Sequence, residues 1–231
     1  MPDLSPTVDG YIGRFNQSSW TNARDGTSGN ASGLTVGQNT LALRADRTSA
    51  RGGGTAFHVY RTFMEFDTSD VKLKPSAATL KVYGYINSTA DLLVVQANFS
   101  DGSLSTADFD SIVNWGAGNR SINVIRYTAS EITSWSTSAY NELELSETAL
   151  EHMVENDLIK MCFIEYDHDL TDNSPTGLNR SGMYFSEASL ASRRPLISYT
   201  PLLNSFNGVS SSNIASINGV ASGNISKING V

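Results

Sequence analysis

One polar stretch, Asp167 to Asn173, holds the residues with the clearest potential for metal chemistry. It carries carboxylates at Asp167, Asp169 and Asp172. Hard oxygen ligands at alternating loop positions are typical of Ca²⁺ sites. The stretch lacks the glycine and the distal glutamate of the helix-loop-helix calcium motif, so a polar turn without metal is the alternative. The three aspartates are the candidate metal ligands, and Ca²⁺ is the one cofactor that the sequence suggests.

A second set of carboxylates, Glu65, Glu165 and Glu187, lies on or beside expected strands. Two carboxylates facing a groove can hydrolyse a glycan, one as acid and the other as base or nucleophile. The sequence does not place the three relative to one another. The alternative is that Glu65 and Glu165 form structural pairs with arginines such as Arg61.

Recognisable catalytic motifs are missing from the chain. It has no Gly-x-Ser-x-Gly turn, no phosphate-binding glycine loop before a helix and no His-Glu-x-x-His sequence. The histidines, His58, His152 and His168, are far apart in the sequence and lack metal-ligand spacing. We therefore predict that the protein is not an enzyme, and we assign no catalytic residue.

Three tryptophans, Trp20, Trp115 and Trp135, lie in or beside segments rich in Ser, Thr, Asn and Gly. Aromatic rings exposed on loops can stack against the CH faces of sugars, so Trp20 and Trp135 are candidate glycan-binding residues. The alternative is that the tryptophans close the ends of the fold, since Trp is usually mostly buried.

The composition argues against several partners. The net charge is -7 and no basic stripe occurs, so we expect no nucleic acid. No apolar run is long enough for membrane insertion. The single cysteine, Cys162, lies in an apolar run and is expected to be a buried thiol. The first residues do not resemble a signal peptide, which predicts synthesis and folding in a cytoplasm.

The elements that must position these residues are mainly short strands. Alternating or continuous apolar runs bounded by turn residues predict strands, here over 8–15, 41–44, 57–66, 79–86, 92–99, 141–145, 159–166, 183–186 and 196–199. The stretch 92–99 is nearly all apolar and is expected to be covered on both sides. Residues 16–40 are expected to form a long surface loop.

One helix is expected after Ser146, which can cap it, with Leu150, Met153 and Val154 at helical spacing. Strands without intervening helices favour a sandwich or barrel. We predict an all-β fold for residues 1–201: a jelly-roll-like antiparallel β-sandwich with one or two short helices.

The segment 202–231 differs in composition and repeats. Asn-Gly-Val begins at 207, 218 and 229, so the period is 11 residues. Each Asn-Gly favours a tight turn, and the apolar residues keep a fixed register. A low-complexity disordered end is the alternative. We predict an extended assembly or attachment tail formed by Phe206, Asn207, Gly208, Val209, Ile214, Ile217, Asn218, Gly219, Val220, Ile225, Ile228, Asn229, Gly230 and Val231.

Four segments between residues 55 and 200 carry a family resemblance: 61–69 (RTFMEFDTS), 77–83 (AATLKVY), 184–187 (YFSE) and 194–199 (RPLISY). Their order resembles the DNRLRE-type β-sandwich, a jelly roll related in shape to carbohydrate-binding modules. The chain lacks the Thr-Trp-Asn segment common in that family, and Asn114-Trp115-Gly116 is the nearest counterpart. Because the family is mostly non-catalytic, no catalytic residue carries over.

The tail is similar to the Ile-Asn-Gly-Val repeats that end many virion structural proteins of tailed bacteriophages. Together with Asp9-Gly10-Tyr11 and Arg51-Gly52-Gly53-Gly54, it resembles such a protein. The resemblance implies a capsid decoration, head-fibre or tail-associated subunit at the virion surface. Its partners would be other capsid or tail subunits, and it would form a homo-oligomer. The competing hypothesis is a carbohydrate-binding adhesion module that recognises host-surface glycans.

Overall fold

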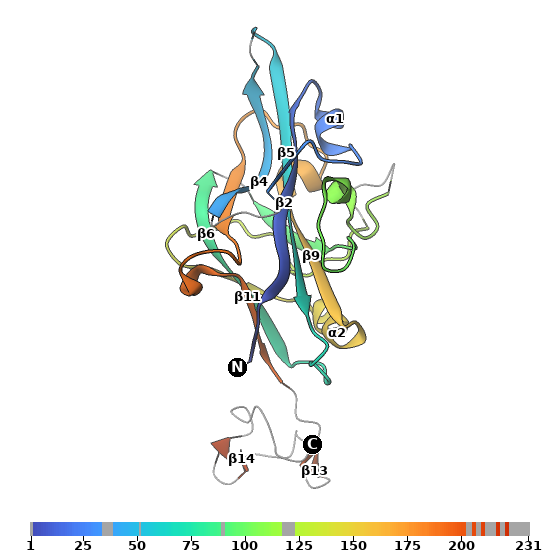
Figure 1. The fold of residues 1–231 in the computed structure, drawn as a ribbon, viewed down its shortest axis with the longest axis vertical. Helices are drawn as coiled ribbons and strands as arrows, with labels where there is room; N and C mark the ends of the chain where they lie inside the picture. Colours follow the sequence, from blue (N-terminus) through green and yellow to red (C-terminus); the bar gives the residue numbers. More distant parts are fainter. Residues whose placement is uncertain are drawn as a thin grey trace.

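The computed structural model describes residues 2–33, 39–50, 52–88, 91–116 and 123–201, and in the tail 205–206, 209–210, 216–217 and 220–221. The chain is mostly β, with one large antiparallel sheet and few short helices (Figure 1). The strands of the large sheet are β1 (Asp3–Leu4), β2 (Pro6–Gln17), β3 (Ala31–Gly33), β4 (Asn39–Ser49), β5 (Thr55–Asp67), β6 (Ala77–Ser88), β7 (Leu92–Gln96), β8 (Tyr140–Glu144), β9 (Leu158–Glu165), β10 (Arg180–Tyr184) and β11 (Leu196–Thr200).

Five helical segments connect these strands in the described part of the chain. They are the α-helices α1 (Trp20–Arg24) and α2 (Glu147–Glu155), the 3₁₀ turns η1 (Thr106–Asp110) and η3 (Ala191–Arg193), and the π-helical turn η2 (Tyr166–Leu170). Of these, α2 is the longest, and it lies beside β9 at one end of the sheet (Figure 1).

Two long strands change partners along their length and so organise the sheet. The strand order is β1-β11-β6-β10-β4-β5-β2-β3, with β8 on β6 and β7 on β9. In β5, residues 55–60 pair with β4 and residues 62–67 pair with β9, while β2 runs along the other side. In β6, residues 77–83 pair with β11 and β8, and residues 84–87 pair with β10.

Two hydrophobic cores lie against the central strands. The first combines side chains of β5, β7 and β9 with those of β6, β8, β11 and α2; it includes Met64, Phe66, Val94, Phe163, Leu80, Leu143, Ile197, Leu150 and Met153. The second includes Phe63, Val95 and Ile164 from alternate positions of the same central strands, with Trp20 and Phe109. Because successive strand residues point to opposite faces, β7 and β9 are buried on both faces. This confirms the covered strand expected near 92–99.

The helix predicted after Ser146 is present as α2. The Ser146 hydroxyl accepts a hydrogen bond from the backbone N–H of Ala149 at 3.3 Å, which satisfies one of the free donors at the helix start. Leu150 and Met153 lie on its buried face. The capping residue and the apolar spacing were therefore sufficient signals for this element.

The expectation of a surface loop over 16–40 was wrong. This stretch contains α1 and β3, and β3 pairs with β2. Ser19 caps α1 by accepting from the N–H of Asn22 at 3.2 Å, and Trp20 and Arg24 are buried. A five-residue helix shows too little periodicity to be read from sequence, and its stability comes from packing on the sheet.

Gly84 of β6 marks the closest approach between the sheet and a covering segment. A Cβ atom there would lie 2.0 Å from the Ser136 carbonyl oxygen and 2.8 Å from the Trp135 indole nitrogen.

We expect Gly84→Ala to lower the free energy of unfolding by about 1–3 kcal/mol, because the backbone near Gly84 and Ser136 must move to make room for the added methyl group. Urea denaturation measures the change. Gly54→Ala is the matched control, since its Cβ would meet only Ala50 Cβ at 3.8 Å; equal effects of the two variants would contradict the expectation.

Candidate functional site

The described parts of the tail form two hairpin pairs. β12 (Ser205–Phe206) pairs with β13 (Val209–Ser210), and β14 (Ser216–Ile217) pairs with β15 (Val220–Ala221). Phe206 pairs with Val209, and Ile217 pairs with Val220. Each pair flanks one Asn-Gly, so the sequence repeat coincides with a repeated strand pairing.

The other residues predicted for the tail lie outside the described residues. They are Asn207, Gly208, Ile214, Asn218, Gly219, Ile225, Ile228, Asn229, Gly230 and Val231. Their part in assembly stays a prediction.

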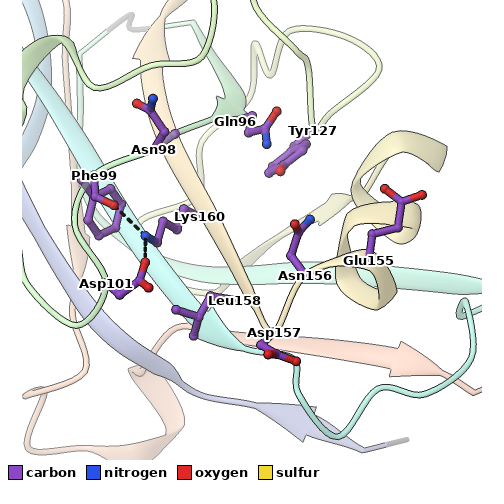
Figure 2. A pocket seen from close by; sticks show the side chains of 11 residues that line it. Gln96, Asn98, Phe99, Asp101, Tyr127, Glu155, Asn156, Asp157, Leu158 and Lys160 are labelled. Carbon is purple, nitrogen blue, oxygen red and sulfur yellow. Dashed lines mark hydrogen bonds and ion pairs between the residues drawn. The ribbon is translucent and has the colours of Figure 1, made fainter.

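A polar groove of roughly 640 Å³ opens where β7 ends, beside the connection from α2 to β9 (Figure 2). Its walls carry three amides, Gln96, Asn98 and Asn156, and three carboxylates, Asp101, Glu155 and Asp157. Lys160 also lines the groove. In the close view the Gln96 and Asn156 side chains lie on the α2 side and Lys160 points toward Asp101. The groove therefore offers many hydrogen-bond donors and acceptors within reach of one ligand.

The charges in the groove are only partly balanced. Lys160 Nζ donates to the Phe99 carbonyl oxygen at 2.6 Å, forms an ion pair with Asp101 and lies 3.7 Å from Glu65 Oε2. No hydrogen bond or ion pair to a described residue involves the Glu155 or Asp157 side chain. The groove has an acidic rim around one engaged lysine, which suits a neutral polyol or a cationic ligand better than an anion.

The floor of the groove holds an unsatisfied acceptor. Gln96 Oε1 is buried and has no hydrogen-bond partner among the described residues. Because this oxygen has almost no solvent-accessible surface, it is not itself open to a ligand in the groove, and leaving it without a donor costs about 1–3 kcal/mol of solvation. The adjoining rings of Phe99 and Tyr127 are 2 % and 1 % exposed, so a ligand would be held by hydrogen bonds rather than ring stacking.

Sequence reasoning missed this groove, although it left a trace in the sequence. Gln96 interrupts an otherwise apolar strand, and Glu155-Asn156-Asp157 is a polar run between a helix and a strand. Neither feature indicates that the two segments meet. The pairing of β7 with β9, in which Gln96 lies opposite Met161, brings them together.

The three aspartates that are candidate calcium ligands, Asp167, Asp169 and Asp172, are not brought together in the structure. Asp169 is fully buried, and both of its oxygens bind Arg61, at 2.7 and 2.8 Å. Asp172 accepts from the indole N–H of Trp20 at 3.1 Å, and Asp167 is exposed. Among the described residues no three His, Cys, Asp or Glu side chains are grouped so as to hold a metal ion. The Arg61 guanidinium supplies to Asp169 the positive charge that the sequence analysis assigned to a metal ion.

Trp20 and Trp135 are core residues, so the predicted sugar-stacking role does not fit their placement. They are 9 % and 6 % exposed, and the Trp135 indole donates to the Gly182 carbonyl oxygen at 3.1 Å. Trp115 is 5 % exposed and lies beneath two guanidinium groups, those of Arg61 at 4.6 Å and Arg24 at 5.0 Å. Burial of the ring faces leaves little aromatic surface for a glycan.

Glu65 and Glu165 are each held by structural hydrogen bonds. Glu65 accepts from the Thr7 hydroxyl at 2.7 Å, and Glu165 accepts from the N–H groups of His168 and Asp169, at 2.7 and 3.1 Å. Burial raises the pKa of Glu165, although its bonds to His168 oppose the shift. Glu187 is exposed on another connection. Neither Glu65 nor Glu165 pairs with Arg61, which is bound to Asp169 instead.

The histidines and the cysteine have structural roles. His58 Nε2 lies 2.8 Å from the Thr48 hydroxyl, His152 Nδ1 lies 2.9 Å from the Tyr127 hydroxyl, and His168 Nδ1 lies 3.2 Å from Glu165 Oε1. Cys162 is fully buried, as predicted, and burial raises the pKa of its thiol. The thiol is therefore protected from solution chemistry.

A buried carboxylate that the sequence did not single out lies near the start of the chain. Asp9 is 5 % exposed and accepts from both the backbone N–H and the hydroxyl of Ser186, each at 2.7 Å. Burial raises the pKa of Asp9 to about 6; the bonds from Ser186 lower it and the charge of Glu187 raises it. This contact fastens β2 to the connection after β10.

Comparison with known proteins gives no relative: no protein-family model matches the chain, and no curated protein matches it. No helix in the described part of the chain is both long and apolar enough to cross a membrane.

The Asp9 contact predicts a pH-dependent stability. The folded-state pKa, about 6, lies above the ordinary value of 3.8, so the folded protein binds the proton more tightly and loses stability as pH rises between these values. Asp9→Asn keeps an acceptor for the Ser186 N–H. We expect it to match the parent near pH 4 and exceed it by about 1–3 kcal/mol at pH 7.

Chemical denaturation of both proteins at several pH values measures the difference. Glu187→Gln is a companion variant, because removing that negative charge should shift the Asp9 transition to lower pH. Parallel pH profiles for the parent and Asp9→Asn would show that Asp9 does not titrate in this range.

Proposed function

We propose that this protein is a non-enzymatic structural subunit of a bacteriophage particle: a capsid decoration, head-fibre or tail-associated protein. In this proposal residues 1–201 form a jelly-roll-like β-sandwich displayed at the virion surface, and residues 202–231 join it to other subunits. The protein would be made in the host cytoplasm. The resemblance to DNRLRE-type sandwiches and to phage Ile-Asn-Gly-Val tails supports the proposal.

The packing of the large sheet fits the sandwich. Its first core is filled from one side by Met64 and Phe163 of β5 and β9, and from the other by Leu80, Leu143 and Ile197 of β6, β8 and β11. A sheet that folds over its own core through a shared strand, here β6, is compatible with a jelly roll.

The repeated hairpin pairing in the tail carries the assembly part of the proposal. A two-residue strand pair is too small to be stable in water by itself. Repeats of this kind gain stability by stacking on neighbouring copies or on a partner surface. Two pairings with the same register around Asn-Gly therefore support the proposal that this segment associates.

We expect removal of the tail to abolish oligomerisation. Every buried residue in the two cores precedes residue 200, so a chain ending at Leu202 retains them and should fold. Light-scattering mass after size exclusion should show a defined oligomer for the full chain and a monomer for the shortened chain.

A second variant keeps the length of the chain and replaces Asn218 and Gly219 by alanine, which removes the preference of this dipeptide for a tight turn. This variant should weaken association while the domain keeps its melting temperature. Equal oligomeric masses for the full and shortened chains, or normal incorporation of the shortened chain into particles, would contradict the proposed role of the tail.

Glycan binding is the second candidate function, and the polar groove favours it. The amide and carboxylate side chains that line the groove provide the mixed donors and acceptors that sugar hydroxyls require. Host-surface glycans would be the ligands. A subunit on a particle surface can serve both purposes.

The groove gives a direct test of this candidate. Asn98 is exposed and its side chain has no hydrogen bond to a described residue, so Asn98→Ala should leave stability unchanged. We expect Asn98→Ala to reduce retention on a glycan array about tenfold, in keeping with the loss of one or two ligand hydrogen bonds. Glu131→Gln, at a site away from the groove, is the control. A blank array for the parent protein would exclude this function for the glycans displayed.

A further inference from the structure

Among the described strands β8 pairs only with β6, so one of its edges is unpaired there. Leu145 N donates to the Ala78 carbonyl oxygen at 2.9 Å, and the register places Leu143 opposite Leu80. In an antiparallel pair, alternate residues direct their N–H and C=O groups to the same side. The backbone groups of Tyr140, Glu142 and Glu144 therefore point away from β6. Within the described chain they have no hydrogen-bond partner.

A second groove, of roughly 500 Å³, runs along this free edge. It is lined by residues 140–144 and by the segment 128–134. The segment 128–134 is fixed to β7, because Leu92 and Ile132 exchange backbone hydrogen bonds at 3.1 and 2.8 Å. The edge thus faces an open channel with firm sides, as required for an added strand that lies about 4.8 Å from its neighbour.

The charges beside the edge disfavour its pairing with itself. Glu131, Glu142 and Glu144 are exposed around the groove, and Lys81 offsets only Glu142, at 3.1 Å. Two β8 edges brought together would place these carboxylates opposite one another, and like charges in that position repel. Natural edge strands use such charges to prevent association. An uncharged, β-forming segment meets no such repulsion.

The tail has that composition. Residues 202–231 contain no Asp or Glu, and Lys227 is their one charged side chain. Phe206, Val209, Ile217 and Val220 already adopt extended pairing. The tail leaves the domain after β11, and β6 and β8 lie between β11 and the groove, which favours the groove of another copy as its acceptor.

We propose that the free edge of β8 binds a tail segment from a second copy of this chain by β-strand addition. The inference rests on the proposed assembly role of the tail and assigns its acceptor. Main-chain hydrogen bonds to Tyr140, Glu142 and Glu144 provide the affinity. The 11-residue repeat supplies several equivalent segments, so one tail can engage more than one acceptor in succession.

Amide hydrogen exchange followed by NMR tests the contact directly. The N–H groups of Glu142 and Glu144 should exchange at least about tenfold more slowly in the full chain than in a chain ending at Leu202. Leu143, whose N–H faces β6, is the internal control and should be protected in both. To separate the two sources of the tail, isotope-labelled shortened chain is mixed with unlabelled full chain.

Slower exchange at Glu142 and Glu144 of the labelled shortened chain would show that the tail arrives from another copy. Protection confined to labelled full chain, and absent from this mixture, would assign the groove to the chain's own tail and overturn the proposal. If the full chain is an oligomer but these amides exchange equally with and without the tail, the tail associates elsewhere. If the full chain is a monomer, the proposed assembly role itself fails.

A substitution in the edge provides an independent test. Glu142→Pro removes only an N–H that faces the groove, a position where edge strands tolerate proline. It should reduce the full chain to monomer mass, whereas Glu142→Gln should leave the oligomer intact. Melting curves of both variants in the shortened chain check the fold. An oligomer that persists in folded Glu142→Pro would overturn the proposal.

Discussion

A single buried ion pair, between Arg61 and Asp169, connects the parts of this fold that have little regular structure. Arg61 lies in β5 between the residues that pair with β4 and those that pair with β9. Its side chain is fully buried and bidentate to Asp169, and it also donates to the backbone oxygens of Phe109 and Arg24. Burial is the largest effect and lowers the pKa of Arg61, but the charge and the hydrogen bonds of Asp169, with smaller contributions from neighbouring groups, together outweigh it, so the net shift is upward. An unpaired charge there would cost several kcal/mol. The segments η1, α1 and η2 therefore each contribute an acceptor to the buried guanidinium.

Most of the longer strands could be located from sequence, because each depends on alternation within a few residues, whereas β1 and β3 were not predicted. The segments 79–86 and 159–166 correspond to β6 and β9, and the Ser146 cap located α2. Pairing and sheet order depend on contacts between distant residues. Arg61 and Asp169 are 108 residues apart, and no sequence feature near either residue indicates that the two form a pair. For that reason an acidic loop was interpreted as a cation site when its cation is an arginine side chain.

The candidate site was less predictable than the fold. Polar surroundings suggested exposed rings for Trp20 and Trp135, but a tryptophan can face inward from a polar segment when its indole N–H finds an acceptor, as both do here. The polar groove lies where β7 ends, and the β8 edge belongs to a strand with one described neighbour. Strand length and register decide such features, and both depend on tertiary pairing.

The pairing of β1 with β11 has a consequence for how the domain is made. Asp3 lies opposite Ser198, and their side chains share a hydrogen bond across 195 residues of chain. Contacts so distant in sequence raise the contact order and slow folding. During translation β1 cannot pair with β11 until nearly the whole domain has left the ribosome. The large sheet is therefore completed late in synthesis, and its early segments depend on remaining soluble until the last strand arrives.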